Sequence, residues 1–500
     1  MLFFTTSIMA QVTTSSINGK VVAGNEDVIG ATVTAVHVPS GTTYNAVTNS
    51  SGRYTIQGMR VGGPYKVTIS YIGYKNEERK GLNLELGEAT VIDADLKEDA
   101  RELGEVVVSG VAGKGGMGAS SNFNQKQIEN APTVDRNIYD VAKLSPLVSS
   151  NKFGGITIAG SNNRYNSFQI DGMVANDVFG LAASGTNGGQ TGANPISMDA
   201  VEQIQVVASP FDVRQSGFTG GAINAITKSG TNDFHGSAYT YYTDENMYSR
   251  WSPYYNMTQK LTNETTKTYG ATFGGPIIKD KLFFFGSVEY KKDEYPASYW
   301  AGSSNYFMTQ DLAAAMADKY YAVTGIKESY NRRNLNTDAL SILGRIDWNI
   351  NSNNHFSIRY QLNDSYKDNY SVGTYSYTFN NSGYKQKDKT NSFVAELTSH
   401  ISQSLYNELR VGASFIRDKR ETPYSGPNIY ISYAPGYDMT THQNTTGSYT
   451  YNMGTEFSSG ANTLNQDIYT VEDNLSWYLG NHTLTFGTHN EFYNMLYSAL

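Results

Sequence analysis

The second half of the chain alternates between apolar and polar residues with a period of two. In SILGRIDWNI (341–350) and HFSIRYQLND (355–364), apolar side chains fall on one face of an extended strand and polar ones on the other. The tight turn NINSNNH joins these stretches, whereas the connections at 295–338 and 420–466 are long. Short turns at one end and long loops at the other are typical of outer-membrane β-barrels. The pattern therefore predicts an antiparallel transmembrane β-barrel over residues 231–500. The side chains expected to face lipid include Ile346, Trp348, Phe356 and Ile358.

The strand count limits this prediction. We expect about nine or ten strands after residue 233 from the alternating segments, whereas a plugged outer-membrane transporter has ~22. An open sheet leaves unpaired backbone groups at its edges, which hydrocarbon does not tolerate. Only the first part of a barrel is therefore expected in these 500 residues, as the N-terminal portion of a longer protein.

Residues 15–97 show shorter strands and closer turns. ATVTAVHV and YKVTISYIGY alternate with period two, and the sequence Asn49-Ser50-Ser51-Gly52 supplies a turn between two further strands. Several short strands at this spacing predict a β-sandwich. Residues 121–230 differ, because short amphipathic helices alternate with short strands there. This segment is predicted to be a mixed α/β domain, with Asp199 as the N-cap of a helix that opens DAVEQIQVV.

The linker at 98–120 contains a small β-forming stretch, Glu105-Val106-Val107-Val108-Ser109, between a charged run and a Gly- and Ser-rich run. Such a stretch suits β-augmentation, in which its backbone joins the sheet edge of another protein. Alternatively, Val106 to Val108 form the first strand of the mixed α/β domain. Because little apolar surface can be buried, we expect residues 98–120 to be poorly ordered without a partner.

Composition narrows the function. The chain has no Cys, which excludes a thiolate metal site, a disulfide framework and a Cys nucleophile. The net charge of −8 without a basic block argues against nucleic acid as a partner. None of the seven His forms an H-E-x-x-H motif, and His37 and His235 stand alone, so no metal site, catalytic residue or cofactor is predicted and the chain is not expected to be an enzyme. Composition alone fits a soluble all-β protein equally well.

The start, MLFFTTSIMAQV, predicts a signal-peptide remnant at residues 1–10, although no Lys or Arg precedes its apolar stretch.

Two segments resemble known domains. The run from GKVV through IGATVTAVHVPSGTTYNAVTNSSGRYTIQGM to YKVTISYIGY resembles the carboxypeptidase regulatory-like domain that precedes many outer-membrane receptors of the Bacteroidetes type. That likeness implies an accessory domain and no peptidase activity. The order of IAGSNNRYNSFQIDG, VEQIQVV and GFTGGAINAITKSG resembles the plug domain of TonB-dependent receptors, and the wording is closest to their Oar-like branch. The plug-motif positions are Arg164, Ile170, Asp171, Gly172, Gly220, Gly221 and Asn224.

One position departs from the plug pattern. Many plugs carry an Arg where this chain has Ala159, and that Arg pairs with an acidic residue of the barrel. Its absence puts the usual plug–barrel ion pair in doubt.

The resemblance implies a function for the linker stretch. Glu105 to Ser109 occupy the place of the TonB box, which binds a TonB-type energy-coupling protein of the inner membrane. The chain is then a receptor in the lipid of the cell outer membrane, with its N-terminal domain in the periplasm, for energised uptake of an unidentified ligand such as a siderophore, glycan or peptide. The alternative is an outer-membrane adhesion or protein-export protein with a carbohydrate-binding-like N-terminal domain. Deletion of 105–109 distinguishes them, because only uptake requires the box.

Overall fold

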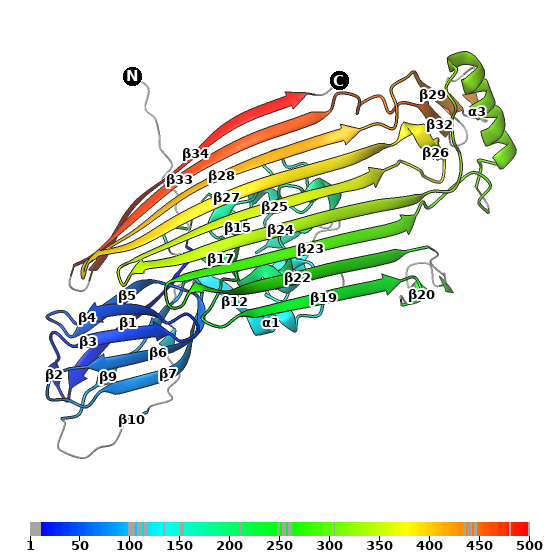
Figure 1. Ribbon diagram of the computed structural model, residues 1–500. Helices are drawn as coiled ribbons and strands as arrows, with labels where there is room; N and C mark the ends of the chain where they lie inside the picture. Colours follow the sequence, from blue (N-terminus) through cyan, green and yellow to red (C-terminus); the bar gives the residue numbers. More distant parts are fainter. Residues whose placement is uncertain are drawn as a thin grey trace, which may run out of the picture.

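The chain builds three parts: a sandwich, a small mixed domain and a large curved sheet. The mixed domain lies against one face of the sheet, and the sandwich lies at one end of its strands (Figure 1). The computed structural model describes residues 12–98, 106–107, 113–114, 118–133, 136–150, 155–210, 212–215, 217–247, 251–252, 257–258, 263–304, 306–433, 437–438, 440, 443–444, 448–479 and 482–498. The predicted signal-peptide remnant at 1–10 lies outside these residues. Among the residues described, no helix is long and apolar enough to cross a membrane.

The N-terminal sandwich packs two sheets over an apolar core. Its strands are β1 (Ser15–Ala23), β2 (Glu26–Asp27), β3 (Thr32–His37), β4 (Thr42–Val47), β5 (Arg53–Met59), β6 (Gly62–Ser70), β7 (Glu77–Leu84), β8 (Ala89–Val91) and β9 (Ala94–Asp95). Every second side chain of β1, β5 and β6 is buried, which is why the period-two stretches fold as strands. Ile17, Ile56 and Ile69 are completely buried at the centre.

Two short segments of the linker pair with this sandwich. β10 (Val106–Val107) lies parallel to β7, with Val106 opposite Glu77 and Val107 opposite Glu78. β11 (Gly113–Lys114) lies antiparallel to β8. The two valines therefore extend the sandwich sheet of order β10-β7-β6-β3-β4 and do not join the sheet of the mixed domain.

The mixed domain has a five-stranded sheet of order β12-β17-β18-β15-β16. Its strands are β12 (Gly118–Asn124), β17 (Val201–Pro210), β18 (Ala222–Thr227), β15 (Ser167–Ile170) and β16 (Met173–Val174), with a separate hairpin of β13 (Val148–Ser150) and β14 (Ile156–Ile158). Two helices, α1 (Gln125–Glu129) and α2 (Ile138–Ala142), are each capped by an Asn side chain. Three 3₁₀ turns, η1 (Asn163–Tyr165), η2 (Gly189–Thr191) and η3 (Met198–Ala200), complete it.

The prediction of an N-cap at Asp199 is wrong. Ser197 precedes the 3₁₀ turn η3, Asp199 lies within that turn, and VEQIQVV is the first part of strand β17. The β-branched residues of this stretch are buried in the domain core next to β12 and β18, and that burial decides for a strand. Asp199 instead forms an ion pair with Arg136.

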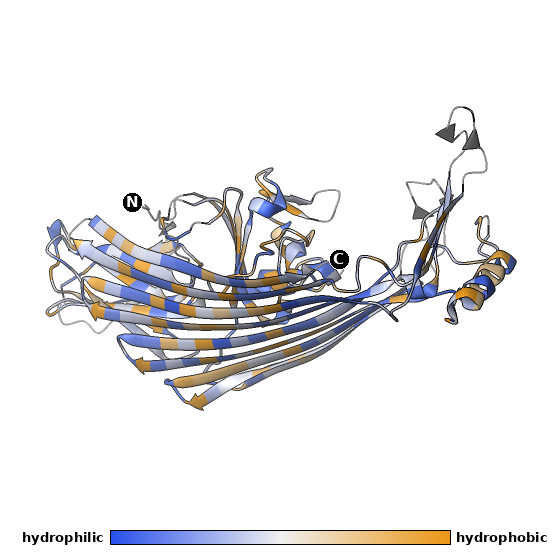
Figure 2. Cartoon of the chain, turned by 90° about the horizontal axis from the view of Figure 1, so that it is seen from above, coloured by the Kyte–Doolittle hydropathy of each residue, from blue (hydrophilic) through white to orange (hydrophobic). Residues whose placement is uncertain are grey.

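Within the described residues, the large sheet has nine antiparallel strands in the order β19-β22-β23-β24-β25-β27-β28-β33-β34. They are β19 (His235–Asp244), β22 (Thr265–Ile278), β23 (Leu282–Pro296), β24 (Asn334–Asn351), β25 (Asn354–Asn369), β27 (Tyr384–Ser402), β28 (Leu405–Glu421), β33 (Thr463–Leu479) and β34 (His482–Ser498). Ile346 lies opposite Ile358, and Trp348 lies opposite Phe356. The side chains of Ile346, Trp348 and Ile358 are exposed, as expected for the lipid face. Apolar and polar positions alternate along these strands (Figure 2).

The long connections carry their own structure at the end of the sheet away from the sandwich (Figure 1). Helix α3 (Gln310–Thr324) begins at the Thr309 cap and ends at Gly325. It packs near a sheet of β26 (Ser376–Thr378), β32 (Tyr449–Gly454) and β29 (Asn428–Tyr433), next to the 3₁₀ turn η4 (Asn380–Ser382), around a shared aromatic core. Two small hairpins are also present: β20 (Trp251–Ser252) with β21 (Met257–Thr258) in the connection between β19 and β22, and β30 (Tyr437–Asp438) with β31 (Gln443–Asn444) between β29 and β32.

Candidate functional site at the contact of plug, wall and sandwich

The predicted motif Ile170-Asp171-Gly172 forms a tight turn that presents one carboxylate. Ile170 pairs with Met173, so Asp171 and Gly172 are the two central residues of the β15–β16 hairpin, and both have positive φ, 46° and 74°. A two-residue hairpin turn of this kind favours Asp-Gly. Asp171 also accepts hydrogen bonds from the Thr227 backbone N–H and the Thr227 hydroxyl, each at 2.8 Å. The turn is therefore fixed to the end of β18.

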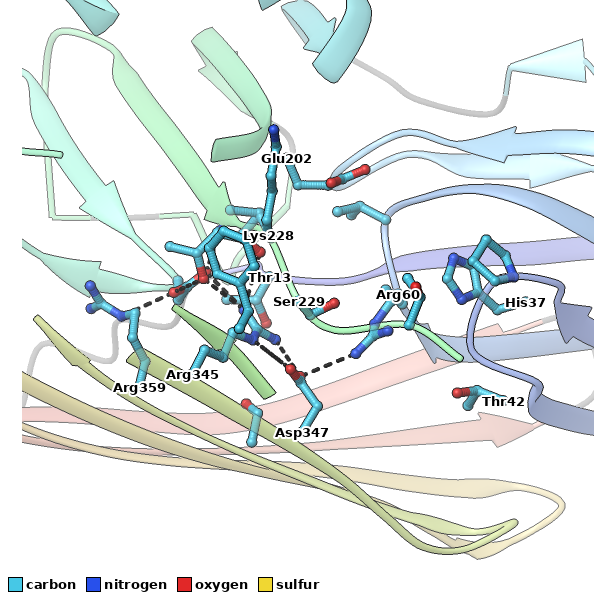
Figure 3. A pocket seen from close by; sticks show the side chains of 18 of the residues that line it. Thr13, His37, Thr42, Arg60, Glu202, Lys228, Ser229, Arg345, Asp347 and Arg359 are labelled. Carbon is cyan, nitrogen blue, oxygen red and sulfur yellow. Dashed lines mark hydrogen bonds and ion pairs between the residues drawn. The ribbon is translucent and has the colours of Figure 1, made fainter. Parts of the chain in front are cut away.

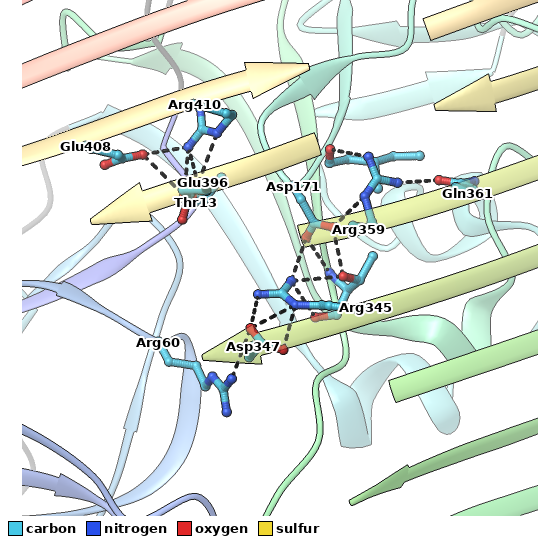
Figure 4. Close-up of polar contacts among 12 residues, drawn as sticks. Thr13, Arg60, Asp171, Arg345, Asp347, Arg359, Gln361, Glu396, Glu408 and Arg410 are labelled. Carbon is cyan, nitrogen blue, oxygen red and sulfur yellow. Dashed lines mark hydrogen bonds and ion pairs between the residues drawn. The ribbon is translucent and has the colours of Figure 1, made fainter. Parts of the chain in front are cut away.

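Two arginines of the large sheet hold this carboxylate (Figure 4). Arg345 Nη1 lies 3.3 Å from Asp171 Oδ1, and Arg359 Nε lies 3.0 Å from Asp171 Oδ2. Arg345 and Arg359 are directly opposite each other on β24 and β25, where two like charges repel. The carboxylate of Asp171 lies close to both guanidinium groups and offsets this repulsion. The mixed domain and the large sheet are thus joined by ion pairs in which the mixed domain provides the acid, Asp171 at the β15–β16 turn, and the sheet provides the two arginines.

A second ionic cluster lies beside it on the same wall. Arg410 is completely buried and contacts Glu396 at 2.7 Å, Glu408 at 2.5 Å and Glu472 at 2.9 Å. A Cβ atom at Gly172 would lie 2.5 Å from Arg410 Cζ, so a side chain there would collide with the guanidinium. Gly172 is therefore required both by its positive φ and by this close approach.

The other predicted plug-motif residues serve the interior of the mixed domain. A Cβ atom at Gly221 would lie 2.4 Å from Ile158 Cγ2, and one at Gly220 would lie 2.3 Å from Asn166 Oδ1. Asn224 donates a hydrogen bond to Gln205 at 3.3 Å. Arg164 lies on η1 at the opposite end of β15 and donates to the Gly180 carbonyl at 3.0 Å. The structure brings Ile170, Asp171 and Gly172 to the wall and leaves Arg164 apart from them.

The predicted TonB-binding stretch is described only in part. Val106 and Val107 form β10, whereas Glu105, Val108 and Ser109 lie outside the described residues. The backbone of the two valines is extended, as β-augmentation requires. One edge of this short strand already pairs with β7.

Sequence reasoning missed the contacts that dock the sandwich at the inner end of the sheet. Arg60 Nη2 lies 3.2 Å from Asp347 Oδ1, and the Asn349 amide donates to the Thr42 hydroxyl at 2.8 Å. His400 Nε2 lies 3.1 Å from the Gln57 carbonyl. The alternation pattern did place Asp347 and Asn349 on the polar face, but nothing in the pattern indicates that their partners lie about 300 residues earlier in the chain.

Backbone groups of the sandwich also bind the mixed domain. The Leu86 N–H donates to Gln203 Oε1 at 2.8 Å, and the Leu86 carbonyl accepts from Gln205 Nε2 at 2.5 Å. Around them, Val61, Leu86 and Ile226 form a small buried apolar cluster. The sandwich is thus attached to both other parts.

A cavity of about 700 Å³ lies where the three parts meet (Figure 3). Its lining mixes charges, including Arg60, Glu202 and Lys228. Burial raises the pKa of Glu202, although Lys228 and Arg60 oppose that shift. Burial, followed by the charge of Arg60, lowers the pKa of His37 to about 3, so this histidine is neutral at physiological pH. Among the described residues, no group of three or more His, Cys, Asp or Glu side chains could hold a metal ion.

Comparison with known proteins now assigns the family. The sequence matches the outer membrane beta barrel domain over residues 226–304 and 304–499, the carboxypeptidase regulatory-like domain over 16–97, and the TonB-dependent receptor plug domain over 114–223. The chain is therefore a mostly β outer-membrane protein with barrel-forming sheet, plug and accessory sandwich. It belongs to the TonB-dependent outer-membrane receptors, a family without enzymatic activity.

Individual relatives are similar over part of their length. The TonB-dependent transporter Oar of Myxococcus xanthus is 28% identical over 256 residues, covering 48% of this chain and 23% of that protein. The solved outer membrane transporter YddB from Escherichia coli is 18% identical with a TM-score of 0.49, covering 74% of this chain and 47% of that one. A ferric enterobactin receptor (PfeA) variant from Pseudomonas aeruginosa is 14% identical with a TM-score of 0.46, covering 74% and 48%. The chain spans about half the length of these solved structures and less of Oar.

Proposed function

We propose that this protein takes up a ligand across the outer membrane with energy delivered by a TonB-type protein of the inner membrane. The observation that carries the proposal is the seating of the plug on the concave side of the barrel sheet by ion pairs and hydrogen bonds, above all those of Asp171 with Arg345 and Arg359. Polar contacts of this kind can be exchanged for water when the plug moves. A plug held in this way can open a path without unfolding the barrel.

Glu105 to Ser109 are the segment on which the energy-coupling protein acts in this proposal. Val106 and Val107 form the outermost strand of the sheet β10-β7-β6-β3-β4, and their second edge has no neighbour among the described strands. A partner strand can add to that edge through main-chain hydrogen bonds. The sandwich then lies in the periplasm, next to the short turns of the barrel sheet (Figure 1).

Ligand binding belongs to the opposite end in this proposal. The connections there expose aromatic side chains, including Tyr375, Tyr430, Tyr433 and Phe457. Flat aromatic faces suit the rings of a siderophore, the faces of sugars and the side chains of a peptide. The ligand class is therefore proposed no more narrowly than siderophore, glycan or peptide.

Substitution of Val107 tests the coupling segment. Val107→Pro removes a backbone N–H and fixes φ, so it should strongly weaken binding of the purified periplasmic domain of a TonB-type protein to the detergent-solubilised chain. Val107→Ala keeps the backbone donor and should change binding little. Calorimetric titration of both variants measures the difference. Equal loss in both variants would indicate recognition of the side chain and would contradict β-augmentation.

A cell assay separates uptake from adhesion. Deletion of 105–109 should abolish energised uptake of a labelled ferric siderophore, oligosaccharide or peptide that binds the cells, while surface binding of the same probe remains. Unchanged uptake after the deletion would contradict the proposal and favour the adhesion or export alternative.

A further inference from the structure

Five charged side chains connect the plug, the barrel wall and the sandwich in one chain of ion pairs (Figure 4). Asp171 of the plug contacts Arg345 and Arg359 of the wall; Arg345 contacts Asp347, and Asp347 contacts Arg60 of the sandwich. The set contains three guanidinium groups and two carboxylates. Each part of the protein contributes to it, and the two carboxylates come from different parts.

Arg345 of the wall and Arg60 of the sandwich both contact the same oxygen atom of Asp347. Asp347 Oδ1 is 2.8 Å from Arg345 Nη2 and 3.2 Å from Arg60 Nη2. The exposed fractions of these side chains are 9% for Asp347, 14% for Arg345 and 19% for Arg60. Water and salt therefore screen these charges weakly, and removal of one of the five charges changes the electrostatic energy of the others.

Movement of the plug would change this balance. When Asp171 leaves, Asp347 is the one carboxylate left in this set, whereas Arg345, Arg359 and Arg60 keep their three positive charges. Arg345 and Arg359 are fixed on β24 and β25, whereas Arg60 belongs to a separate domain and makes the longer contact. The excess positive charge of Arg345 and Arg359 then repels Arg60. Because Arg60 is the cation that can move, the sandwich moves away with it.

Glu396 of the second ionic cluster attracts Arg345 electrostatically and remains on the wall when Asp171 leaves. Glu396 and Glu408 are both held by Arg410 on the same wall, at 2.7 Å and 2.5 Å. Glu202 of the plug interacts electrostatically with Arg60 and would move with the plug, so its departure acts in the same direction.

We propose that the carboxypeptidase regulatory-like sandwich is a gate docked at the periplasmic mouth, and that withdrawal of Asp171 from Arg345 and Arg359 releases it through Arg60. The inference rests on the proposed transport function, because it assumes that the plug moves. By linkage, docking of the sandwich also stabilises the seated plug. Arg60 acts as a positioning residue in this device.

The docking equilibrium can be measured on the full chain in detergent micelles. The sequence contains no Cys, so cysteines introduced at the exposed positions Arg53 of the sandwich and Ser352 of a wall turn are its only thiols. Spin labels there report the distance between sandwich and wall by pulsed electron paramagnetic resonance. The unsubstituted chain should give one dominant docked distance.

Asp171→Asn should convert most of this signal to a longer, broader distribution. Arg60→Met should also weaken docking. Asp171→Asn should add no further effect in the Arg60→Met background, because the guanidinium group through which Asp171 acts on the sandwich is then already absent. Lys20→Met is the matched control: it removes a sandwich cation whose ion pair is with Asp27 of the sandwich itself, and it should leave the docked distance unchanged.

A charge rescue separates release from misfolding. Arg359→Gln combined with Asp171→Asn removes one cation and one anion, so the excess charge equals that of the unsubstituted chain, and the docked distance should return. Amide protection of β17 and β18 in the same samples reports whether the plug is folded. Three outcomes would each overturn the proposal. The label distance is unchanged in Asp171→Asn although the plug is folded; the effects of Asp171→Asn and Arg60→Met on that distance add; or Arg359→Gln does not restore the docked distance. None of these variants alters 105–109, so failure of the Val107 test and failure of this test remain distinguishable.

Discussion

Gly221 shows how a single position of the plug is restricted by its neighbours. A Cβ atom there would lie 2.4 Å from Ile158 Cγ2 and 2.6 Å from the Val207 carbonyl oxygen. Neither atom can withdraw without moving β14 or β17. Gly221→Ala should therefore destabilise the plug by about 1–3 kcal/mol, the usual cost of overpacking a core. Amide exchange of β18 measures this loss.

Gly344→Ala provides the control at the same scale. Nothing lies within 4 Å of a Cβ atom built at Gly344, and this residue is in a strand of the large sheet. The alanine should change stability by no more than about 0.5 kcal/mol. If both variants lose the same protection, crowding at Gly221 is not the cause.

At the scale of elements, the cost of placing a charged residue on the lipid face of β24 should depend on its depth in the bilayer. Ile342 lies near the middle of this strand and is paired with Leu362 on β25, whereas Ile350 lies next to the short turn. Ile342→Arg should cost about 2–4 kcal/mol, because Arg is most unfavourable near the bilayer midplane and costs about 0–1 kcal/mol near the interface. Ile350→Arg should therefore be nearly neutral. Urea-dependent unfolding of the chain in detergent micelles measures both, and equal costs would contradict the placement of the strand.

Period-two alternation was sufficient to predict β24 and β25, because the lipid side and the inner side require opposite chemistry at every second residue. It was not sufficient for β17, where burial on both sides removes the alternation and VEQIQVV resembles the start of a helix. The position of the linker valines could not be predicted either. Their neighbour β7 offers a sheet edge, and no pattern in the linker identifies that edge as the partner.

At the scale of the whole molecule, the relative positions of the sandwich, the plug and the sheet are fixed by a few polar contacts between them. Gln203 of the plug accepts a hydrogen bond from the buried Leu86 N–H of the sandwich at 2.8 Å. Gln203→Leu leaves that N–H without its partner, which should cost about 1–3 kcal/mol of docking free energy. The label distance between positions 53 and 352 should shift accordingly. Gln125→Leu, at an exposed plug residue, should have no effect, and an equal shift in both variants would contradict a specific role for Gln203.

The order of sandwich, linker, plug and barrel could be predicted because each part has its own local pattern and resemblance. The contacts between the parts could not. Asp171 was singled out as part of a turn motif, but its arginine partners are about 170 to 190 residues away. Ala159 put the usual ion pair in doubt, and only the fold shows that the plug and the wall are joined instead by the ion pairs of Asp171.

The Asp171 contact makes the plug and the wall depend on each other's charges. An Arg at position 171 would bring a further guanidinium group against Arg345 and Arg359, while Asp347 already contacts both Arg345 and Arg60. Such a plug would fit this wall only if Arg345 or Arg359 were replaced by an acidic residue at the same time.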